Sequence, residues 1–286
     1  MNIDTLILSG GSTKGISFLG SINYLIENKY IEKDFKNIKK VICVSASYLF
    51  ILSLILLNYD SELLEKELLT FDYNKLLDIK DISLKNFVNE YGFINYSRTH
   101  IYIKKLLKDR YNVESMSLLK LYKLSGIHII VKVVNVSEQK VEYMDHINNP
   151  KMNILKLIQM TTAIPILIKP IKYKNNLYQD GGLSGNCPIE VNNSENYLCI
   201  EILPNKCKKN INNIFDYLQS GWSMYTPDIL IRKNDKNNIK IDLTELYLNP
   251  SSFDISYDMR KKLLIEGYRQ TEEHFNHHPY LQQSNN

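Results

Sequence analysis

The sequence predicts an α/β fold with helices on both faces of a mostly parallel central sheet. In the first part of the chain, short apolar runs alternate with segments whose apolar residues recur at helical spacing. The run Val41–Leu57, VICVSASYLFILSLILL, carries no charge, as expected for a strand and a helix that are buried on all sides. No Pro/Gly-rich linker divides the 286 residues. We therefore expect one domain over residues 1–278 and a frayed tail over 279–286.

Each element follows from local pattern. Apolar, β-branched runs predict strands at Thr5–Leu8, Lys40–Val44, Ile127–Asn135, Lys140–Met144, Ile171–Tyr178 and Tyr197–Ile202. Helical spacing predicts helices at Lys14–Asn28, Ala46–Asn58, Met152–Thr162 and Tyr257–Phe275. The polar region from Ser61 to Leu121 favours helix, with a turn at Tyr91-Gly92.

Composition limits the partners that the chain can be expected to have. A hydrophobic content of 44% and a charged content of 23% are ordinary for a soluble protein. The net charge of +4 tolerates an anionic membrane surface. No dense stripe of Lys and Arg is present, so we expect no nucleic-acid partner. Val41–Leu57 approaches the roughly 20 residues that cross a bilayer, which leaves a membrane-embedded protein as a rival class.

The cysteines and the N-terminus bear on localisation. Cys43, Cys187, Cys199 and Cys207 show neither C-x-x-C pairing nor zinc-ligand spacing, so we expect reduced thiols and no metal site. The N-terminus enters a strand directly, without the charged and apolar regions of a signal peptide. These features predict a cytoplasmic protein that is not secreted, with peripheral contact to a membrane left open.

A glycine-rich turn lies between the first strand and the first helix. Residues 8–15, LSGGSTKG, would hold an anion on backbone N–H groups. A Walker A loop fails because Lys14 precedes Gly15 and Ile16 follows it. A dinucleotide-binding turn fails because Ser12 stands where the second glycine should be. The remaining anion is the oxyanion of an acyl-transfer reaction, which requires a nucleophile nearby.

Ser45 is a candidate nucleophile at the junction of the second strand and the following helix. This is the context of a nucleophile elbow, whose usual pattern is G-x-S-x-G. Here Cys43 and Ser47 occupy both glycine positions. Both are small but carry a Cβ atom where strand and helix pass closely. Taken alone, Ser45 also fits an ordinary helix N-cap.

Asp180 is a candidate base. It follows an apolar segment and precedes Gly181 and Gly182, which would free the backbone to present the carboxylate. Taken alone, the Asp-Gly pair is a common turn.

In this order, the three stretches resemble the patatin-like phospholipases. That family has a G-G-G-x-[RK]-G loop, a G-x-S-x-G elbow and a late D-G-[GA]; this chain has GGSTKG at 10–15, CVSAS at 43–47 and DGG at 180–182. The segments at 117–145, 160–173 and 261–275 are also similar to segments of the family. The resemblance covers most of residues 1–275 and implies a three-layer α/β/α fold with a mostly parallel central sheet.

The resemblance also implies roles for individual residues. Ser45 would attack an ester carbonyl of a phospholipid or related acyl ester, and Asp180 would be its direct base. The N–H groups of Gly11 and Ser12 would form the oxyanion hole, with Gly10 shaping the turn. Lys14 would hold the loop or meet a headgroup phosphate, and Gly15, Gly181 and Gly182 would support these segments. No metal or organic cofactor is implied.

Two further alternatives stay open on the sequence. Replacement of both elbow glycines by Cys43 and Ser47 allows a catalytically impaired protein that binds lipid or a partner. The order Ser45, Asp180 and then His274, His277 or His278 also matches a Ser-Asp-His hydrolase. Against the second, these histidines lie in a polar stretch at a helix end, where positive charge suits the helix dipole.

Overall fold

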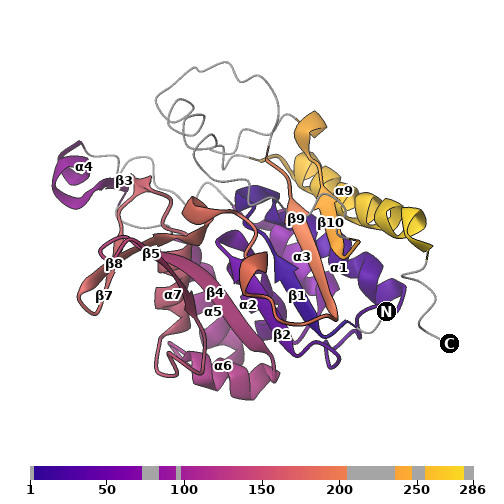
Figure 1. Cartoon of the computed structure of the whole chain (residues 1–286), viewed down its shortest axis with the longest axis horizontal. Coiled ribbons are helices and arrows are strands. Elements are labelled where there is room, and N and C mark those ends of the chain that lie inside the picture. Colours follow the sequence, from indigo (N-terminus) through magenta and orange to yellow (C-terminus); the bar gives the residue numbers. More distant parts are fainter. Residues whose placement is uncertain (1–2, 73–83, 95–97, 205–235, 247–254, 280–286) are drawn as a thin grey trace.

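The strands of the protein form from short runs rich in Val, Ile and Leu, which suit a buried pleated surface. The computed structural model describes residues 3–72, 84–94, 98–204, 236–246 and 255–279 (Figure 1). Its strands are β1 Thr5–Leu8, β2 Lys40–Val44, β3 Gly92–Ile94, β4 His128–Asn135, β5 Lys140–Met144, β6 Ile166–Ile168, β7 Ile171–Tyr173, β8 Asn176–Asp180, β9 Tyr197–Ile202 and β10 Asn238–Ile241.

The helices alternate with these strands. The α-helices are α1 Ser17–Glu27, α2 Ala46–Leu56, α3 Ser61–Thr70, α4 Leu84–Glu90, α5 Thr99–Tyr111, α6 Leu118–Ser125, α7 Ile154–Thr161 and α9 Tyr257–His277. Short 3₁₀ helices are η1 Ser12–Ile16, η4 Gly181–Ser184, η5 Ile189–Val191 and η6 Thr244–Leu246.

A mostly parallel sheet lies at the centre, as predicted. Its strand order is β10-β9-β1-β2-β4-β8-β7, with β5 paired to β4. Strands β10, β9, β1, β2 and β4 are mutually parallel, whereas β5 and β8 run antiparallel to β4. Since β1 and β2 are parallel neighbours, the loops that leave their carboxyl ends emerge at the same edge of the sheet, the usual location of a site in such folds.

Layers of different kinds cover the two faces of the sheet. The main core joins helices α1, α2, α5, α7 and α9 to side chains such as Leu6, Leu8 and Val41. On the opposite face, Ile7 and Ile42 pack with Cys187 and Cys199, so the segment that carries η5 contributes to this cover. The predicted three-layer architecture is confirmed.

The uncharged run at 41–57 is the interior strand and helix that its composition predicts. Helix α2 is apolar on every side, and nine of its residues are buried. Within the described residues, no helix is both long enough and apolar enough to cross a membrane.

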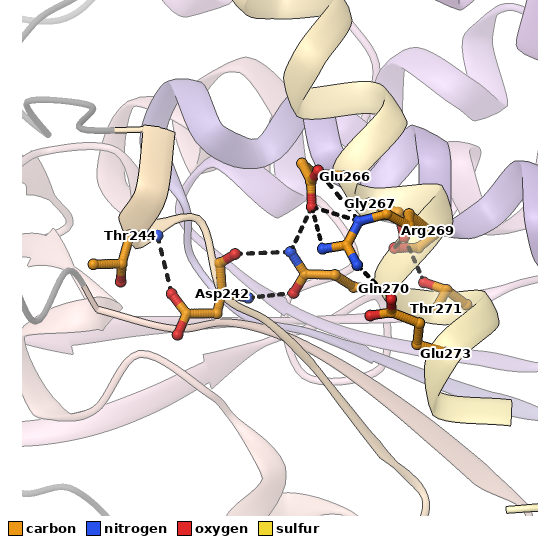
Figure 2. A network of polar contacts seen from close by, with 9 residues as sticks. Asp242, Thr244, Glu266, Gly267, Arg269, Gln270, Thr271 and Glu273 are labelled. Atoms are coloured by element: carbon orange, nitrogen blue, oxygen red, sulfur yellow. Dashed lines mark hydrogen bonds and ion pairs between the residues drawn. The ribbon is translucent and has the colours of Figure 1, made fainter. Parts of the chain in front are cut away.

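Helix α9 returns the end of the chain to its beginning. An added Cβ at Gly267 would lie 2.0 Å from the Ser17 carbonyl oxygen, and one at Gly20 would lie 1.9 Å from the Leu264 carbonyl oxygen. The two helices are therefore in backbone contact. Polar side chains fix α9 to the end of β10, where the Gln270 side-chain amide exchanges two 2.7 Å hydrogen bonds with the Asp242 backbone (Figure 2).

Several predicted elements differ from the structure. The single strand expected at Ile171–Tyr178 is the hairpin β7–β8, which turns where Lys174 takes a φ of 51°. The helix expected from Lys14 begins with the 3₁₀ helix η1 and becomes α-helical at Ser17. Strands β3, β6 and β10 are short and were not predicted; parts of the helical region from Ser61 to Leu121 lie outside the described residues.

The register of β4 brings the ends of two other strands together. Strand β2 pairs with β4 up to Val44 opposite Lys132, and β8 pairs with it from Asp180 opposite Val133. Strand β5 occupies the other edge of β4 along this stretch. Strands β2 and β8 therefore approach each other end to end along one edge of β4. The residue after Val44 is Ser45, and the last residue of β8 is Asp180.

Candidate active site

Ser45 occupies a sharp turn between β2 and α2. Its backbone has φ 58° and ψ −129°, a conformation that L-residues rarely adopt and that costs about 1–3 kcal/mol. Its N–H donates to Thr161 Oγ1 at 2.8 Å, and its carbonyl accepts from the Tyr48 N–H at the start of α2. The side chain makes no capping hydrogen bond to the helix, so it is available for another partner.

That partner is Asp180. Ser45 Oγ donates to Asp180 Oδ2 at 2.6 Å, and the second carboxylate oxygen, Oδ1, accepts from the Gly182 N–H at 2.8 Å. The glycine after the aspartate therefore holds the carboxylate, while the serine hydroxyl points at it directly. The structure brings together two residues that lie 135 positions apart in the sequence.

Burial sets the acidity of this carboxyl group. Asp180 is 6% exposed, and desolvation raises its pKa to about 6 from an ordinary value of 3.8. The hydrogen bonds from Ser45 and Gly182 and the charge of Lys132 act in the opposite direction, in that order of size. A carboxylate with a pKa near neutrality is a better proton acceptor than an exposed one.

The glycine loop after β1 lies beside Ser45. An added Cβ at Gly10 would come 3.4 Å from Ser45 Cβ and 2.3 Å from the Asn186 side-chain oxygen. Gly10 also exchanges two 2.9 Å hydrogen bonds with Asn186, through its N–H and its carbonyl. No acceptor for the N–H of Gly11 or Ser12 is found among the described residues. These two donors lie in the loop that turns next to Ser45.

Ser12 stands where the G-G-G-x-[RK]-G pattern has its third glycine, and its backbone conformation explains why glycine is usual there. Its φ is 50°, in the left-handed region that glycine enters without a Cβ penalty. Lys14 is 6% exposed, and its carbonyl accepts from Ser17 Oγ at 2.9 Å. Gly15 has only ordinary contacts, because an added Cβ would come no closer than 3.6 Å to any neighbour.

The two non-glycine residues of the elbow are accommodated. Ser47 is fully buried; its hydroxyl accepts from the Val44 N–H at 3.0 Å and lies 3.1 Å from the Leu8 carbonyl oxygen and 2.7 Å from that of Val44. Cys43 lies in β2 opposite Leu8 and is also fully buried. Ser47 thus links the ends of β1 and β2 at the elbow.

Three residues of this site were missed by the sequence reasoning. Thr161 accepts the Ser45 N–H, Asn186 clamps Gly10, and Lys132 lies between the ends of β2 and β8. Lys132 could have been noticed, because it is the one charged residue between apolar neighbours in IIVKVVN. Thr161 and Asn186 are small polar residues in ordinary contexts and give no signal of their own.

The histidines of the rival hydrolase lie at the end of α9, near the edge strand β10 of the sheet. His274 Nε2 lies 2.8 Å from the Lys236 carbonyl oxygen, and His277 and His278 contact the carbonyls of Glu273 and His274. With β10 residues, all three line a cavity at the sheet edge opposite β7 and β8. The described parts of the chain hold no group of three or more His, Cys, Asp or Glu side chains suited to a metal ion.

The three cysteines within the described ranges form no disulfide. Cys43, Cys187 and Cys199 are buried thiols, and Sγ of Cys187 lies 3.2 Å from Sγ of Cys199. Cys207 lies outside the described residues.

Comparison with known proteins gives relatives in two viruses. The chain is 22% identical over 271 residues to an uncharacterized protein, R571, of Acanthamoeba polyphaga mimivirus, covering 91% of this chain and 89% of that protein. It is 26% identical over 187 residues to the probable lipid hydrolase 463L of Invertebrate iridescent virus 6, covering 65% of this chain and 62% of that one.

Solved structures share the fold. VipD from Legionella pneumophila aligns with a TM-score of 0.65 at 19% identity, over 97% of this chain and 67% of VipD. The type III effector ExoU of Pseudomonas aeruginosa aligns with a TM-score of 0.57 at 14% identity, over 97% of this chain and 53% of ExoU. The chain thus spans about half of ExoU and less than two thirds of the iridescent-virus protein.

A sequence profile described as patatin-like phospholipase matches residues 6–192, which contain the glycine loop, the elbow and the Asp-Gly-Gly segment. The match covers more than half of the chain and agrees with the fold. This protein belongs to the patatin-like phospholipase family.

Proposed function

We propose that the protein is a serine acyl hydrolase of the phospholipase A type, which cleaves ester bonds of phospholipids or related lipids. The observation that carries the proposal is the 2.6 Å hydrogen bond from Ser45 Oγ to Asp180 Oδ2, made by a serine in strained elbow geometry. Membership of the patatin-like phospholipase family and similarity to a viral protein named a probable lipid hydrolase support the choice of lipid esters.

In the proposed reaction, Ser45 and Asp180 act as a dyad. As Ser45 Oγ bonds to the ester carbonyl carbon, its proton passes to Asp180 Oδ2. The proton then goes to the leaving alkoxide oxygen when the ester C–O bond breaks, which leaves an acyl group on Ser45 and releases the alcohol. A water molecule hydrolyses the acyl-enzyme by the same route, with Asp180 taking and returning a proton.

The glycine loop would stabilise the charge that develops on the carbonyl oxygen. The Gly11 and Ser12 N–H groups are proposed as the donors, and the clamp between Gly10 and Asn186 supports a fixed loop. The N-terminus of α2 adds its positive dipole end at Ser45. Loss of one oxyanion donor in other acyl-transfer enzymes costs about 10²–10³ in turnover. The burial of Lys14 favours a role in holding this loop over contact with a headgroup.

The geometry of the elbow favours an active enzyme over a catalytically impaired protein. That alternative depends on the Cβ atoms of Cys43 and Ser47 disturbing the elbow. Both side chains are buried, the Ser47 hydroxyl has partners at the strand ends, and the contact between Ser45 and Asp180 forms. We also propose that residues 1–278 form a single domain, since α9 packs against α1 in backbone contact.

Labelling with a fluorophosphonate tests the proposed nucleophile, because this reagent modifies an activated serine. The wild type is compared with Ser45→Ala and Asp180→Asn, each checked for folding by circular dichroism, and the labelled peptide is identified by mass spectrometry. We expect labelling on Ser45 in the wild type and none in either variant. A folded wild type that takes no label, or takes it elsewhere, would overturn the proposal. Labelling retained in a His274→Ala/His277→Ala/His278→Ala variant separates the dyad from a histidine triad.

A further inference from the structure

Lys132 is a buried cation in the middle of an apolar strand. Its side chain is fully buried, and its Nζ donates to the carbonyl oxygens of Ser184 at 3.2 Å and Gly185 at 3.0 Å and to Glu190 Oε1 at 2.7 Å. A protonated ammonium group has three N–H donors, and here it has three acceptors. Burying a charge is costly unless it is paired in this way, so the arrangement calls for a physical reason.

Lys132 is linked to both residues of the candidate dyad through intervening residues. Its side chain ties down η4 and Gly185, the turn that directly follows Asp180. The turn packs on the lysine itself, since an added Cβ at Gly181 would lie 2.5 Å from the Lys132 carbonyl oxygen. The same carbonyl accepts from Thr161 Oγ1 at 3.1 Å, and Thr161 Oγ1 in turn accepts the Ser45 N–H. One residue of β4 therefore supports the serine through its backbone and the aspartate through its side chain.

We propose that Lys132, with its counterion Glu190, is a positioning residue that holds Ser45 and Asp180 in register and keeps Asp180 available as a carboxylate. The proposal rests on the proposed function and assigns to this pair a role in the reaction that family membership does not supply. Lys132 touches neither the substrate nor the reacting atoms; it acts through the Asp180 turn and through Thr161.

The charges around Asp180 determine the direction in which its pKa should move when one of them is removed. Among the described residues, Lys132 on β4 is the cation that lowers the pKa of Asp180, in opposition to burial. Glu190 on η5 neutralises part of that cation and also accepts a hydrogen bond from the Tyr143 hydroxyl on β5. Ser45 and the Gly182 N–H supply the remaining polar contacts to the carboxylate. Removal of the lysine charge should raise the pKa of Asp180, whereas removal of the glutamate charge should lower it.

Three variants separate this role from simple structural support. Lys132→Met removes the cation, Lys132→Met/Glu190→Gln removes the pair without leaving an unpaired carboxylate, and Glu190→Gln keeps the cation alone. Tyr143→Phe is a matched control, because it removes one hydrogen bond to Glu190 and changes no charge. For each folded variant, the Asp180 carboxyl titration is followed by ¹³C NMR, with Asp180→Asn to assign the signal, and kcat and KM are measured against pH.

We expect the Asp180 titration and the acid limb of kcat/KM to move together to higher pH in both lysine variants. In Glu190→Gln both should move to lower pH, and in Tyr143→Phe neither should move. In Lys132→Met, kcat should fall about 10²-fold with little change in KM, as for a misplaced reacting group.

The proposal can be refuted because it expects shifts of the Asp180 titration in opposite directions in the lysine variants and in Glu190→Gln. An Asp180 titration that is unchanged in a folded lysine variant, or that rises in Glu190→Gln, would overturn it. If the lysine variants do not fold, the direction of the Asp180 titration shift in Glu190→Gln is sufficient to test the proposal. The titration needs no turnover, so a shift of the expected sign in a protein that hydrolyses no ester would contradict the proposed function and leave the electrostatic coupling established.

Discussion

Asp180 combines two properties that usually exclude each other in a carboxyl group. It is buried, which disfavours its charge, and it accepts two short hydrogen bonds, which favour it. Burial is the larger effect, so the pKa is raised to about 6. An aspartate with this pKa is ionised at neutral pH and is a stronger base than an exposed aspartate.

The activity should therefore depend on the ionisation of this one group at low pH. Because the proposed base, Asp180, can accept a proton only when it is deprotonated, we expect kcat/KM to rise through a pKa of about 6 and to level off above it. Initial rates with a soluble acyl ester between pH 4.5 and 8.5 measure this limb. An acid limb centred near pH 4, the range of an ordinary aspartate, would show that burial does not tune the base.

At the scale of elements, the site depends on where strands end. Strands β2 and β8 approach end to end along β4, which places Ser45 and Asp180 at the meeting point. The glycine loop reaches the same place because β1 is parallel to β2 and ends beside it. Helix α1 continues from this loop through η1, and α9 packs against α1. The contact between α1 and α9 therefore supports the glycine loop indirectly, by fixing the helix that follows it.

Gly267→Ala tests this support. The new methyl group would overlap the Ser17 carbonyl oxygen at the start of α1, so we expect a loss of stability of about 1–3 kcal/mol or more, measured by urea denaturation. Activity of the folded fraction should also fall, because η1 and the glycine loop precede Ser17 directly.

Gly15→Ala is the matched control in the same region. Its new methyl group would meet nothing closer than 3.6 Å, so stability should change by less than about 1 kcal/mol. Equal stability losses in the two variants would show that α1 and α9 do not depend on a glycine contact.

At the scale of the whole molecule, the sequence predicted the main architecture, and the two residues that it offers as a catalytic pair, Ser45 and Asp180, are hydrogen-bonded in the structure. The strands at Thr5–Leu8, Lys40–Val44 and Tyr197–Ile202 match the structure at both ends, because each is a buried apolar run between turns. The hairpin at 171–180 was missed although its turn, Lys174-Asn175, contains an asparagine, a residue that favours turns. Strands β3 and β6 have three residues each, too few for a period to be visible, and the four residues of β10 alternate between polar and apolar instead of forming an apolar run.

The supporting residues of the site could not be predicted for a different reason. Thr161 and Asn186 act through single hydrogen bonds to backbone atoms that lie far away in sequence. Such contacts leave no local pattern, since any position could carry a small polar residue. Lys132 is the exception. A charged residue is rarely fully buried, so a lysine within an apolar strand can be recognised in the sequence as unusual.

The buried carboxyl group should also cost the whole molecule stability. Between pH 4 and 6 the unfolded chain releases the Asp180 proton while the native state keeps it, so the free energy of unfolding falls as pH rises. The shift of about 2 pH units corresponds to about 3 kcal/mol. Asp180→Asn carries no charge and should escape this loss. Its stability relative to the wild type should therefore increase by about 2 kcal/mol from pH 4 to pH 7 in urea denaturation; a difference that does not vary with pH would contradict the burial cost.

Hydrolysis of a lipid ester by Ser45 and Asp180 can be measured on a phospholipid itself. The protein is incubated with phosphatidylcholine vesicles in ¹⁸O-labelled water and the products are analysed by mass spectrometry, with Ser45→Ala and Asp180→Asn beside the wild type. We expect the wild type to form lysophospholipid and free fatty acid that carries ¹⁸O in its carboxyl group, and we expect neither product with either variant. Product formed equally by folded Ser45→Ala, or none from a folded wild type across phospholipid and simple acyl-ester substrates, would contradict that expectation.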